Sequence, residues 1–266
     1  MSLNTNKPSY SVLTYIIGDY EVEHPILEKD PEAEYILVTD NVNLTSETWE
    51  VKYVDNPHPE DNFDLCYKIR FNPFDYVNTD IVVRIDGSMQ VNQSLAPIIK
   101  KFNDEKYDIA LLFHPTRQTL YDEYVVWCQV RKYPLEQANR VLNFLAAYEG
   151  YDVKNYKGLY QYNFMIQRNT KVNNDLNRMT LALAKYLAPA GKQIDRLDQT
   201  LGSFVINKYF SDMNIMWWDE RLCHSKFFTW YAHNSNTPFA FGGVETLCKP
   251  FCFNKQYHNQ YRPDDF

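Results

Sequence analysis

The run Asp86-Gly87-Ser88 follows directly after the apolar segment Ile81–Ile85, and its residue types suit a chemical role. A segment that is apolar except for one arginine is typical of a central, buried strand. A carboxylate at the end of such a strand can hold a hard divalent cation or a ribose, while glycine allows close approach and serine adds a hydroxyl oxygen. Because Asp-Gly also occurs commonly in turns, the spacing alone leaves both interpretations open.

Two similar polar runs, Gly18-Asp19-Tyr20 and Asp40-Asn41, follow the predicted strands 11–17 and 34–39. In open α/β sheets, ligands bind beyond the carboxyl ends of the strands. We therefore expect these runs to border the same site as Asp86. Turn formation alone is the competing interpretation for any single run.

Three cations, Lys68, Arg84 and Arg117, could neutralise the charge of a phosphate-bearing ligand. Lys68 belongs to a predicted helix, and a solvated helix face explains it equally well. Arg117 follows a predicted strand together with His114, where it could stabilise a leaving nucleotide. An ion pair between Arg117 and Glu123 is the competing structural interpretation.

The chemistry-bearing residues are distributed over an alternation of strands and helices that predicts an α/β fold with a mostly parallel central sheet flanked by helices. The predicted strands are 11–17, 34–39, 49–54, 81–85, 108–113, 159–167 and 214–218. The predicted helices are 61–71, which carries Lys68 and Arg70, then 94–103, 120–148 with a break at Pro134, 173–187 and 195–209. The aromatic tail from Phe227 is expected to be loop-like.

The composition favours one globular domain over residues 1–266, with a core at about 11–221 and a C-terminal aromatic tail at 222–266 that packs on it. A net charge of −7 argues against nucleic acid as a partner. Five cysteines without paired CxxC spacing indicate a reducing compartment, and no apolar run reaches membrane-spanning length. We therefore expect a cytoplasmic protein without an integral membrane segment. An aromatic content of 16% suits stacking on bases or sugar rings, although an aromatic-rich core explains it as well.

Several runs, in order and spacing, resemble a glycosyltransferase domain of unknown function that occurs in bacteria and in plant Golgi proteins. That domain is a distant relative of the glycogenin-like GT-A enzymes. The resembling runs are Thr14-Tyr15-Ile16-Ile17-Gly18-Asp19-Tyr20, Tyr35-Ile36-Leu37-Val38-Thr39-Asp40-Asn41, Trp49-Glu50-Val51, Arg84-Ile85-Asp86-Gly87-Ser88, His114-Pro115-Thr116-Arg117, Tyr121-Asp122-Glu123 and Arg196-Leu197-Asp198-Gln199. The resemblance covers most of residues 12–221 and implies a hexosyltransferase-like GT-A enzyme that uses a nucleotide-diphosphate sugar.

The resemblance also implies a metal-binding DxD motif at the end of a central strand. Asp86 occupies its first position, and Ser88 replaces the second Asp. A histidine near the C-terminus is the third ligand in related enzymes, and His233 or His258 could fill that place. The implied cation is Mn²⁺ or Mg²⁺, bound weakly because a serine hydroxyl is a weaker ligand than a carboxylate.

The pair Asp198-Gln199 resembles the late Asp-Gln pair of GT-A enzymes, which lies near the acceptor and the transferred sugar. At a helix start, free backbone N–H groups would keep Asp198 ionised, although a simple helix cap is the alternative. Asn163 stands where related enzymes have a sugar-contacting Asn, but Phe164 replaces the glycine that normally follows.

Together these arguments define an expected site. Its catalytic residues are Asp86, Asp198 and Arg117, and its metal ligands are Asp86, Ser88 and His233. Its donor-binding residues are Tyr15, Gly18, Asp19, Asp40, Lys68, Arg84, Asp86, Ser88, His114, Asn163 and Gln199.

Two other functions fit the sequence. A glycan or amide hydrolase could use Asp122 and Glu123 as acid and base, although neither a G-x-S-x-G nor an HExxH motif is present. A catalytically idle nucleotide- or carbohydrate-binding domain is the other. The expected partners of a transferase are a uridine or guanosine diphosphate sugar and a glycan, lipid or protein acceptor. The sequence leaves the oligomeric state and the stereochemical outcome open.

Overall fold

The expected strands assemble into one mixed sheet in a computed structural model that describes residues 9–114, 116–129, 134–156, 158–188, 197–233, 235–238 and 260–261. In this described part of the chain the sheet has eight strands in the order β10-β8-β6-β7-β4-β1-β2-β3. They are β1 (Tyr10–Ile16), β2 (Ala33–Thr39), β3 (Glu50–Tyr53), β4 (Ile81–Ile85), β6 (Ile109–Phe113), β7 (Tyr160–Arg168), β8 (Ile215–Trp218) and β10 (Gln260–Tyr261). The fold is therefore α/β, as predicted, with strand ends close to the expected ones.

The directions of the strands bring the predicted polar runs to one edge. β1 pairs in parallel with both β2 and β4, and β2 pairs in parallel with β3. β7 is antiparallel to both β4 and β6, so β6 and its parallel partner β8 run in the same direction as β4. The carboxyl ends of β1, β2, β4 and β6 therefore lie at the same edge of the sheet.

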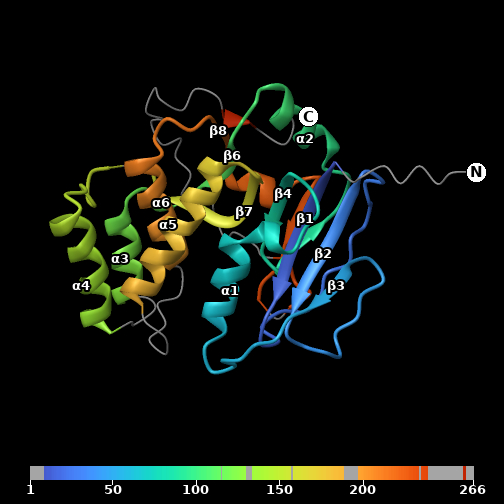
Figure 1. The fold of residues 1–266 in the computed structure, drawn as a ribbon, viewed down its shortest axis with the longest axis horizontal. Coiled ribbons are helices and arrows are strands. Elements are labelled where there is room, and N and C mark those ends of the chain that lie inside the picture. Colours follow the sequence, from blue (N-terminus) through green and yellow to red (C-terminus); the bar gives the residue numbers. More distant parts are fainter. Residues whose placement is uncertain are drawn as a thin grey trace, which may run out of the picture.

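Helices cover both faces of the sheet (Figure 1). On one face α1 and α5 are neighbours, α5 packs on α6, and α3 and α4 lie farther out. On the other face α2 contributes Ile98, Ile99 and Phe102 to a large core cluster. The bounds are α1 (Asn62–Phe71), α2 (Ala96–Asp104), α3 (Leu120–Gln129), α4 (Leu135–Asn143), α5 (Lys171–Leu187) and α6 (Leu197–Tyr209), with a π-helix at Phe144–Tyr148 and 3₁₀ turns at Pro73–Asp75 and Glu220–Cys223. The predicted break at Pro134 is confirmed, since this residue caps α4.

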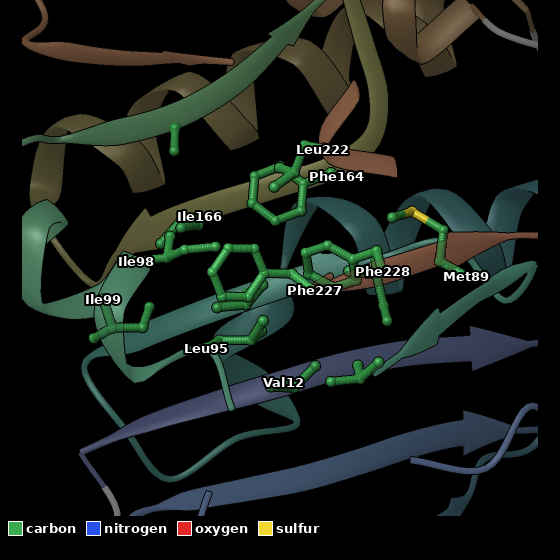
Figure 2. Close-up of a cluster of buried hydrophobic side chains, with 14 of the residues drawn as sticks. Val12, Met89, Leu95, Ile98, Ile99, Phe164, Ile166, Leu222, Phe227 and Phe228 are labelled. Carbon is green, nitrogen blue, oxygen red and sulfur yellow. The ribbon is translucent and has the colours of Figure 1, made fainter. Parts of the chain in front are cut away.

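A small second sheet closes over the α2 face. β5 (Met89–Val91) pairs antiparallel with β9 (Phe228–Trp230). Phe227 and Phe228 are fully buried in the same cluster as Met89 and Val12 (Figure 2). The prediction of a loop was therefore wrong for residues 228–230 and 260–261, because strands this short show no period and their pairing depends on distant partners.

Membrane insertion was not expected from the sequence. Among the helices of the described segments, none combines the length and the apolar character that crossing a bilayer requires.

A bulge in β7 shapes the centre of the sheet. The register between β6 and β7 shifts after Leu111, so that Leu111 lies opposite Met165 and Leu112 opposite Gln161. Tyr162, in the bulged segment, directs its ring against α6 at Gly202, where an added Cβ would lie only 1.9 Å from the Tyr162 hydroxyl. The absence of a side chain at Gly202 is therefore what allows Tyr162 to pack against the helix.

We predict that Gly202→Ala destabilises the protein by about 2 kcal/mol, which is the usual cost of overpacking a tight core. Helix propensity alone would give the opposite sign, because alanine normally stabilises a helix interior relative to glycine. Urea unfolding followed by circular dichroism measures the change. An unchanged or increased unfolding free energy would mean that Tyr162 does not contact α6 in this way.

Candidate active site

The centre of the candidate site is a guanidinium that three other elements of the fold contact. Arg70, near the end of α1, donates from Nη2 to Asp86 Oδ1 at 2.9 Å and from Nε to the Tyr15 hydroxyl at 2.8 Å. Its Nη1 forms an ion pair with Asp198 Oδ2 in the first turn of α6. Arg70 therefore connects the end of β4, the inside of β1 and the start of α6, and it brings together two carboxylates that are far apart in the sequence.

Arg70 was not among the expected site residues. The sequence placed it on the correct helix, but it favoured Lys68 as the phosphate contact. Lys68 instead pairs with Asp64 at 2.6 Å, four residues earlier on the same helix, and Asp64 also lies 3.6 Å from Lys185. The i,i+4 spacing of Asp64 and Lys68 is a sequence signal for this intrahelical pair, and it would have left Arg70 as the available cation.

A second arginine lies beneath the first. Arg84 is only 1% exposed, donates from Nη1 to the Tyr162 carbonyl at 2.9 Å and lies 4.0 Å from Asp86 Oδ1. Burial and the nearby charge of Arg70 lower the pKa of Arg84 to about 10, so it stays charged at neutral pH. Burial also lowers the pKa of Arg70, but Tyr15 and Asp86 outweigh that effect and the pKa is raised.

The charged side chains at this centre balance one another. Arg70 and Arg84 carry two positive charges, and Asp86 and Asp198 carry two negative charges. Asp198 is only 2% exposed, and a buried carboxylate is tolerated when it is paired, as it is here with Arg70. The site therefore contains strongly oriented charges without a net charge of its own.

Several buried polar atoms around this centre have no hydrogen-bond partner within the described part of the chain. They are Nε and Nη2 of Arg84, Oδ1 of Asn163, Nε2 of Gln199, Oε1 of Gln161 and Oγ1 of Thr200. Unpaired buried polar atoms are rare in folded proteins because each one has lost its hydrogen bonds to water. Asn163 is joined to Asp86 through its backbone, and Gln199 and Thr200 follow Asp198 in α6, so their unpaired atoms are candidates for hydrogen bonds to a polar ligand or solvent.

The pairing of β7 with β4 fixes the position of Asn163. Its carbonyl accepts a hydrogen bond from the Asp86 backbone N–H at 2.9 Å, and its side-chain Nδ2 lies 3.4 Å from Cys223 Sγ. Gln199 follows Asp198 in the first turn of α6 and is 6% exposed. The structure therefore brings Asn163 to the end of β4 beside Asp86, and it brings Asp198 there through Arg70.

The polar loops after β1 and β2 are joined by hydrogen bonds. The Gly18 N–H donates to Asp40 Oδ1 at 2.8 Å, and Asn41 Nδ2 donates to Asp19 Oδ1 at 2.8 Å. Gly18 has a φ of +68°, and an added Cβ would lie 2.0 Å from Asn62 Nδ2, so glycine is required at this turn. The predicted clustering of these strand ends at one edge is thus present in the structure.

Tyr20 connects the first loop to Asp86-Gly87. Its hydroxyl lies 3.3 Å from the position that a Cβ of Gly87 would take. Burial, Tyr15 and Asp86 hold the pKa of Tyr20 well above its ordinary value, so its phenol stays protonated. Gly87 therefore leaves room for a neutral phenol beside the carboxylate.

His114 and Arg117 form a separate group beyond the end of β6. Arg117 Nε donates to His114 Nε2 at 3.0 Å, and Arg117 Nη1 pairs with the fully buried Glu123 at 2.5 Å. β7 lies between β6 and β4, so this group is on the same edge as Asp86 but on the other side of β7. The pairing with Glu123 is the structural interpretation that the sequence had left open.

The expected metal ligands do not converge. Ser88 Oγ accepts a hydrogen bond from Trp230 Nε1 at 3.1 Å and is 1% exposed, while His233 Nδ1 pairs with Glu21. Over the segments that the structure describes, no three His, Cys, Asp or Glu side chains are arranged to hold a metal ion. His258 lies outside the described residues, as does Arg196. Of the proposed ligands only Asp86 lies at the centre of the site, where its Oδ1 already accepts from Arg70.

Comparisons with known proteins add little to this geometry. No protein-family profile matches the chain, and no curated protein sequence matches it. Among solved structures, the chain is similar to the apo form of mouse xyloside xylosyltransferase 1, at 7% identity and a TM-score of 0.42, over 76% of this chain and 82% of that chain.

We predict that Arg70→Gln lowers the free energy of unfolding by about 3 kcal/mol, because it leaves the buried Asp198 carboxylate without its cation. Chemical denaturation measures the loss. Arg178→Gln is the matched control, because Arg178 pairs with Asp175 on an exposed helix face and its loss should cost less than about 0.5 kcal/mol. Equal effects of the two substitutions would contradict a central role of Arg70.

Proposed function

We propose that this protein is a glycosyltransferase that transfers a sugar, in the manner of a hexosyltransferase, from a nucleotide-diphosphate donor to a glycan, lipid or protein acceptor. The observation that carries the proposal is the double ion pair of Arg70 with Asp86 and Asp198. The sequence resemblance associates Asp86 with the donor nucleotide and Asp198 with the transferred sugar. Their meeting on one guanidinium supports a single site for both.

Glycosyl transfer makes two electrostatic demands on such a site. Positive charge develops at the anomeric carbon, and negative charge develops on the departing diphosphate. In the proposed mechanism Asp198, paired with Arg70, stabilises the first charge. Arg70 and Arg84 face the second, because a planar guanidinium matches the geometry of phosphate oxygens.

The unpaired polar atoms fit a sugar. A sugar ring presents hydroxyls that both donate and accept hydrogen bonds, and the unpaired atoms include the acceptor Oδ1 of Asn163 and the donors Nε2 of Gln199 and Nε of Arg84. A site built to pair with hydroxyls discriminates strongly against analogues that lack them, because its buried groups then stay unpaired. Asn163 and Gln199 are therefore the proposed specificity residues for the transferred sugar.

The donor nucleotide is proposed to lie along the loops after β1 and β2. Gly18, Asp19 and Asp40 border this region, and Tyr15 lies below it, where its hydroxyl contacts Arg70. Ligands of open α/β sheets bind in this position relative to the strand ends. His114 and Arg117 would reach only a part of the ligand that extends across β7.

Hydrolysis by Asp122 and Glu123 has less support in this structure. Asp122 Oδ2 accepts from the backbone N–H groups of Gln118 and Thr119, both at 2.9 Å, as a capping residue does. Glu123 is fully buried and paired with Arg117. Both carboxylates therefore have structural roles where a hydrolase would need an acid and a base at the substrate.

A reducing location such as the cytoplasm suits the proposal. Cys66 and Cys128 are free thiols, and burial raises the pKa of Cys66 to about 12, which makes it unreactive. The acidic net charge of −7 argues against a nucleic-acid acceptor.

We predict that the protein releases nucleoside diphosphate from a uridine or guanosine diphosphate sugar when a suitable acceptor is present. A coupled assay for released UDP or GDP, run over a panel of sugar nucleotides, measures this. A hydrolase of glycans or amides would free acceptor fragments without nucleotide, and an idle binding domain would free neither. Either result would reject the proposed function.

We predict that Asp86→Asn and Asp198→Asn both reduce turnover by about 100-fold or more, the scale of losing one electrostatic group at a reacting centre. Asp86→Asn should also weaken donor binding, whereas Asp198→Asn should leave the donor dissociation constant nearly unchanged, since its charge acts mainly in the transition state. Steady-state rates and calorimetric donor affinities separate the two. Asp175→Asn, on an exposed helix, is the matched control and should retain full turnover.

Near-normal turnover of Asp86→Asn would contradict its assignment. Unfolding of Asp198→Asn, seen by circular dichroism, would favour a purely structural role for that carboxylate.

A further inference from the structure

We propose that the Arg70 side chain takes the place of a divalent cation in this site, so that the protein binds its donor without a metal ion. The statement about the donor rests on the proposed glycosyltransferase function. The statement about the cation rests on geometry alone, and it departs from the metal use that the sequence resemblance implies.

Arg70 occupies the gap between the two carboxylates at the centre of the site. A cation shared between Asp86 and Asp198 would have to lie between Asp86 Oδ1 and Asp198 Oδ2, which are the two atoms that Arg70 already bridges. Mg²⁺ requires near-octahedral oxygen ligands at about 2.1 Å, so it cannot share these oxygens with a guanidinium in the same gap.

The surrounding charge also opposes a metal. Asp86 Oδ1 lies 2.9 Å from Arg70 Nη2 and 4.0 Å from Arg84 Nη1, so a cation bound to this oxygen would face two guanidinium groups at short range. Arg84 is fully buried, and little solvent screens the repulsion. Before any ligand binds, the two guanidinium groups already balance the two carboxylates, so a divalent cation would add two uncompensated positive charges.

The remaining expected ligands have other partners. Ser88 Oγ accepts from Trp230 Nε1, and the backbone of Ser88 accepts from the Tyr231 N–H at 2.8 Å, so β9 and the segment after it hold this residue. His233 pairs with Glu21, whose side chain is fully buried. Recruiting either residue to a metal at Asp86 would break an existing contact.

The two arginines retain donors for an anionic ligand. A guanidinium has five N–H groups. Arg70 makes one contact from each of its three nitrogens, and Arg84 Nε and Nη2 have no partner in the described structure. Diphosphate oxygens can therefore pair with the remaining N–H groups of Arg70, whose side chain is 14% exposed, without displacing Asp86 or Asp198.

Direct manganese binding tests the cation without any assay of activity. Electron paramagnetic resonance of free Mn²⁺, titrated with the protein alone, should show no tighter binding to the wild type than to Asp86→Asn. Binding at least about tenfold tighter in the wild type would overturn the proposal, since this difference would require a metal site at that carboxylate.

Nucleotide binding tests the ligand. Calorimetric titration with UDP and with GDP should give the same dissociation constant, within about twofold, in excess EDTA and in Mn²⁺. A loss of affinity of about tenfold or more in EDTA would overturn the proposal. If neither nucleotide binds in either buffer, the proposed glycosyltransferase function fails, while the manganese titration of the protein alone still decides whether Arg70 has replaced a metal.

Removing the guanidinium should create the metal site. Arg70→Gln frees both carboxylates and is expected to bind Mn²⁺ at least about tenfold more tightly than the wild type, whereas the control Arg178→Gln should not change. If Arg70→Gln does not fold, Arg70→Lys replaces it in the titration. A single ammonium cannot bridge the two carboxylates as a planar guanidinium does. Arg70→Lys should bind Mn²⁺ more tightly than the wild type. Wild-type Mn²⁺ affinity in a folded Arg70 variant would overturn the proposal.

Discussion

The double ion pair of Arg70 is the constraint on which the rest of the site depends. Asp198 is almost completely buried, and an unpaired carboxylate in that position would destabilise the fold by several kcal/mol. Arg70 meets this requirement only if α1 and α6 approach the end of β4 from the same face of the sheet. α1 and α6 both pack on α5, which places them on the same face. The helix packing and the ion pairs of Arg70 therefore depend on each other. The Tyr15 hydroxyl accepts a hydrogen bond from Arg70 Nε and completes the contacts of the guanidinium.

A charged residue inside a central strand requires an interruption of the regular sheet. Arg84 lies on β4 among apolar neighbours, and its Nη1 needs an acceptor that a regular ladder would already use. The bulge in β7 supplies one, because the Tyr162 carbonyl turns to Arg84 while its ring packs on α6. Gly202 leaves space for that ring. The bulge in β7, the glycine at Gly202 and the burial of Arg84 therefore depend on one another.

The sequence predicts most strands and helices and part of the candidate site. The physical reasons differ between the two. Central strands such as Ile81–Ile85 are buried on both faces and read as continuous apolar runs, and Pro134 interrupts a helical period, so local signals suffice. The position of Asp86 at the same edge as the other polar runs could be predicted, because the strand ends of a parallel sheet share an edge. Arg70 could not be singled out, since the apolar period of α1 fixes its buried face but not which polar neighbour meets a distant carboxylate. The antiparallel direction of β7 and the pairing of β5 with β9 likewise depend on contacts far apart in the sequence.

A cation that belongs to a side chain differs physically from a bound metal ion. A bound metal ion brings two charges and dissociates when its concentration falls, whereas a guanidinium brings one delocalised charge and is always present. The arginine that is proposed to face the ligand also pairs with Asp198 in the fold, so this cation cannot be removed without cost to stability. Because the four charges cancel before any ligand arrives, selectivity must come from orientation and from the unpaired groups of Arg84, Asn163 and Gln199 rather than from a strong field. Under the proposed function, a polyhydroxylated, phosphate-bearing molecule that pairs with these groups would bind better than a simple anion.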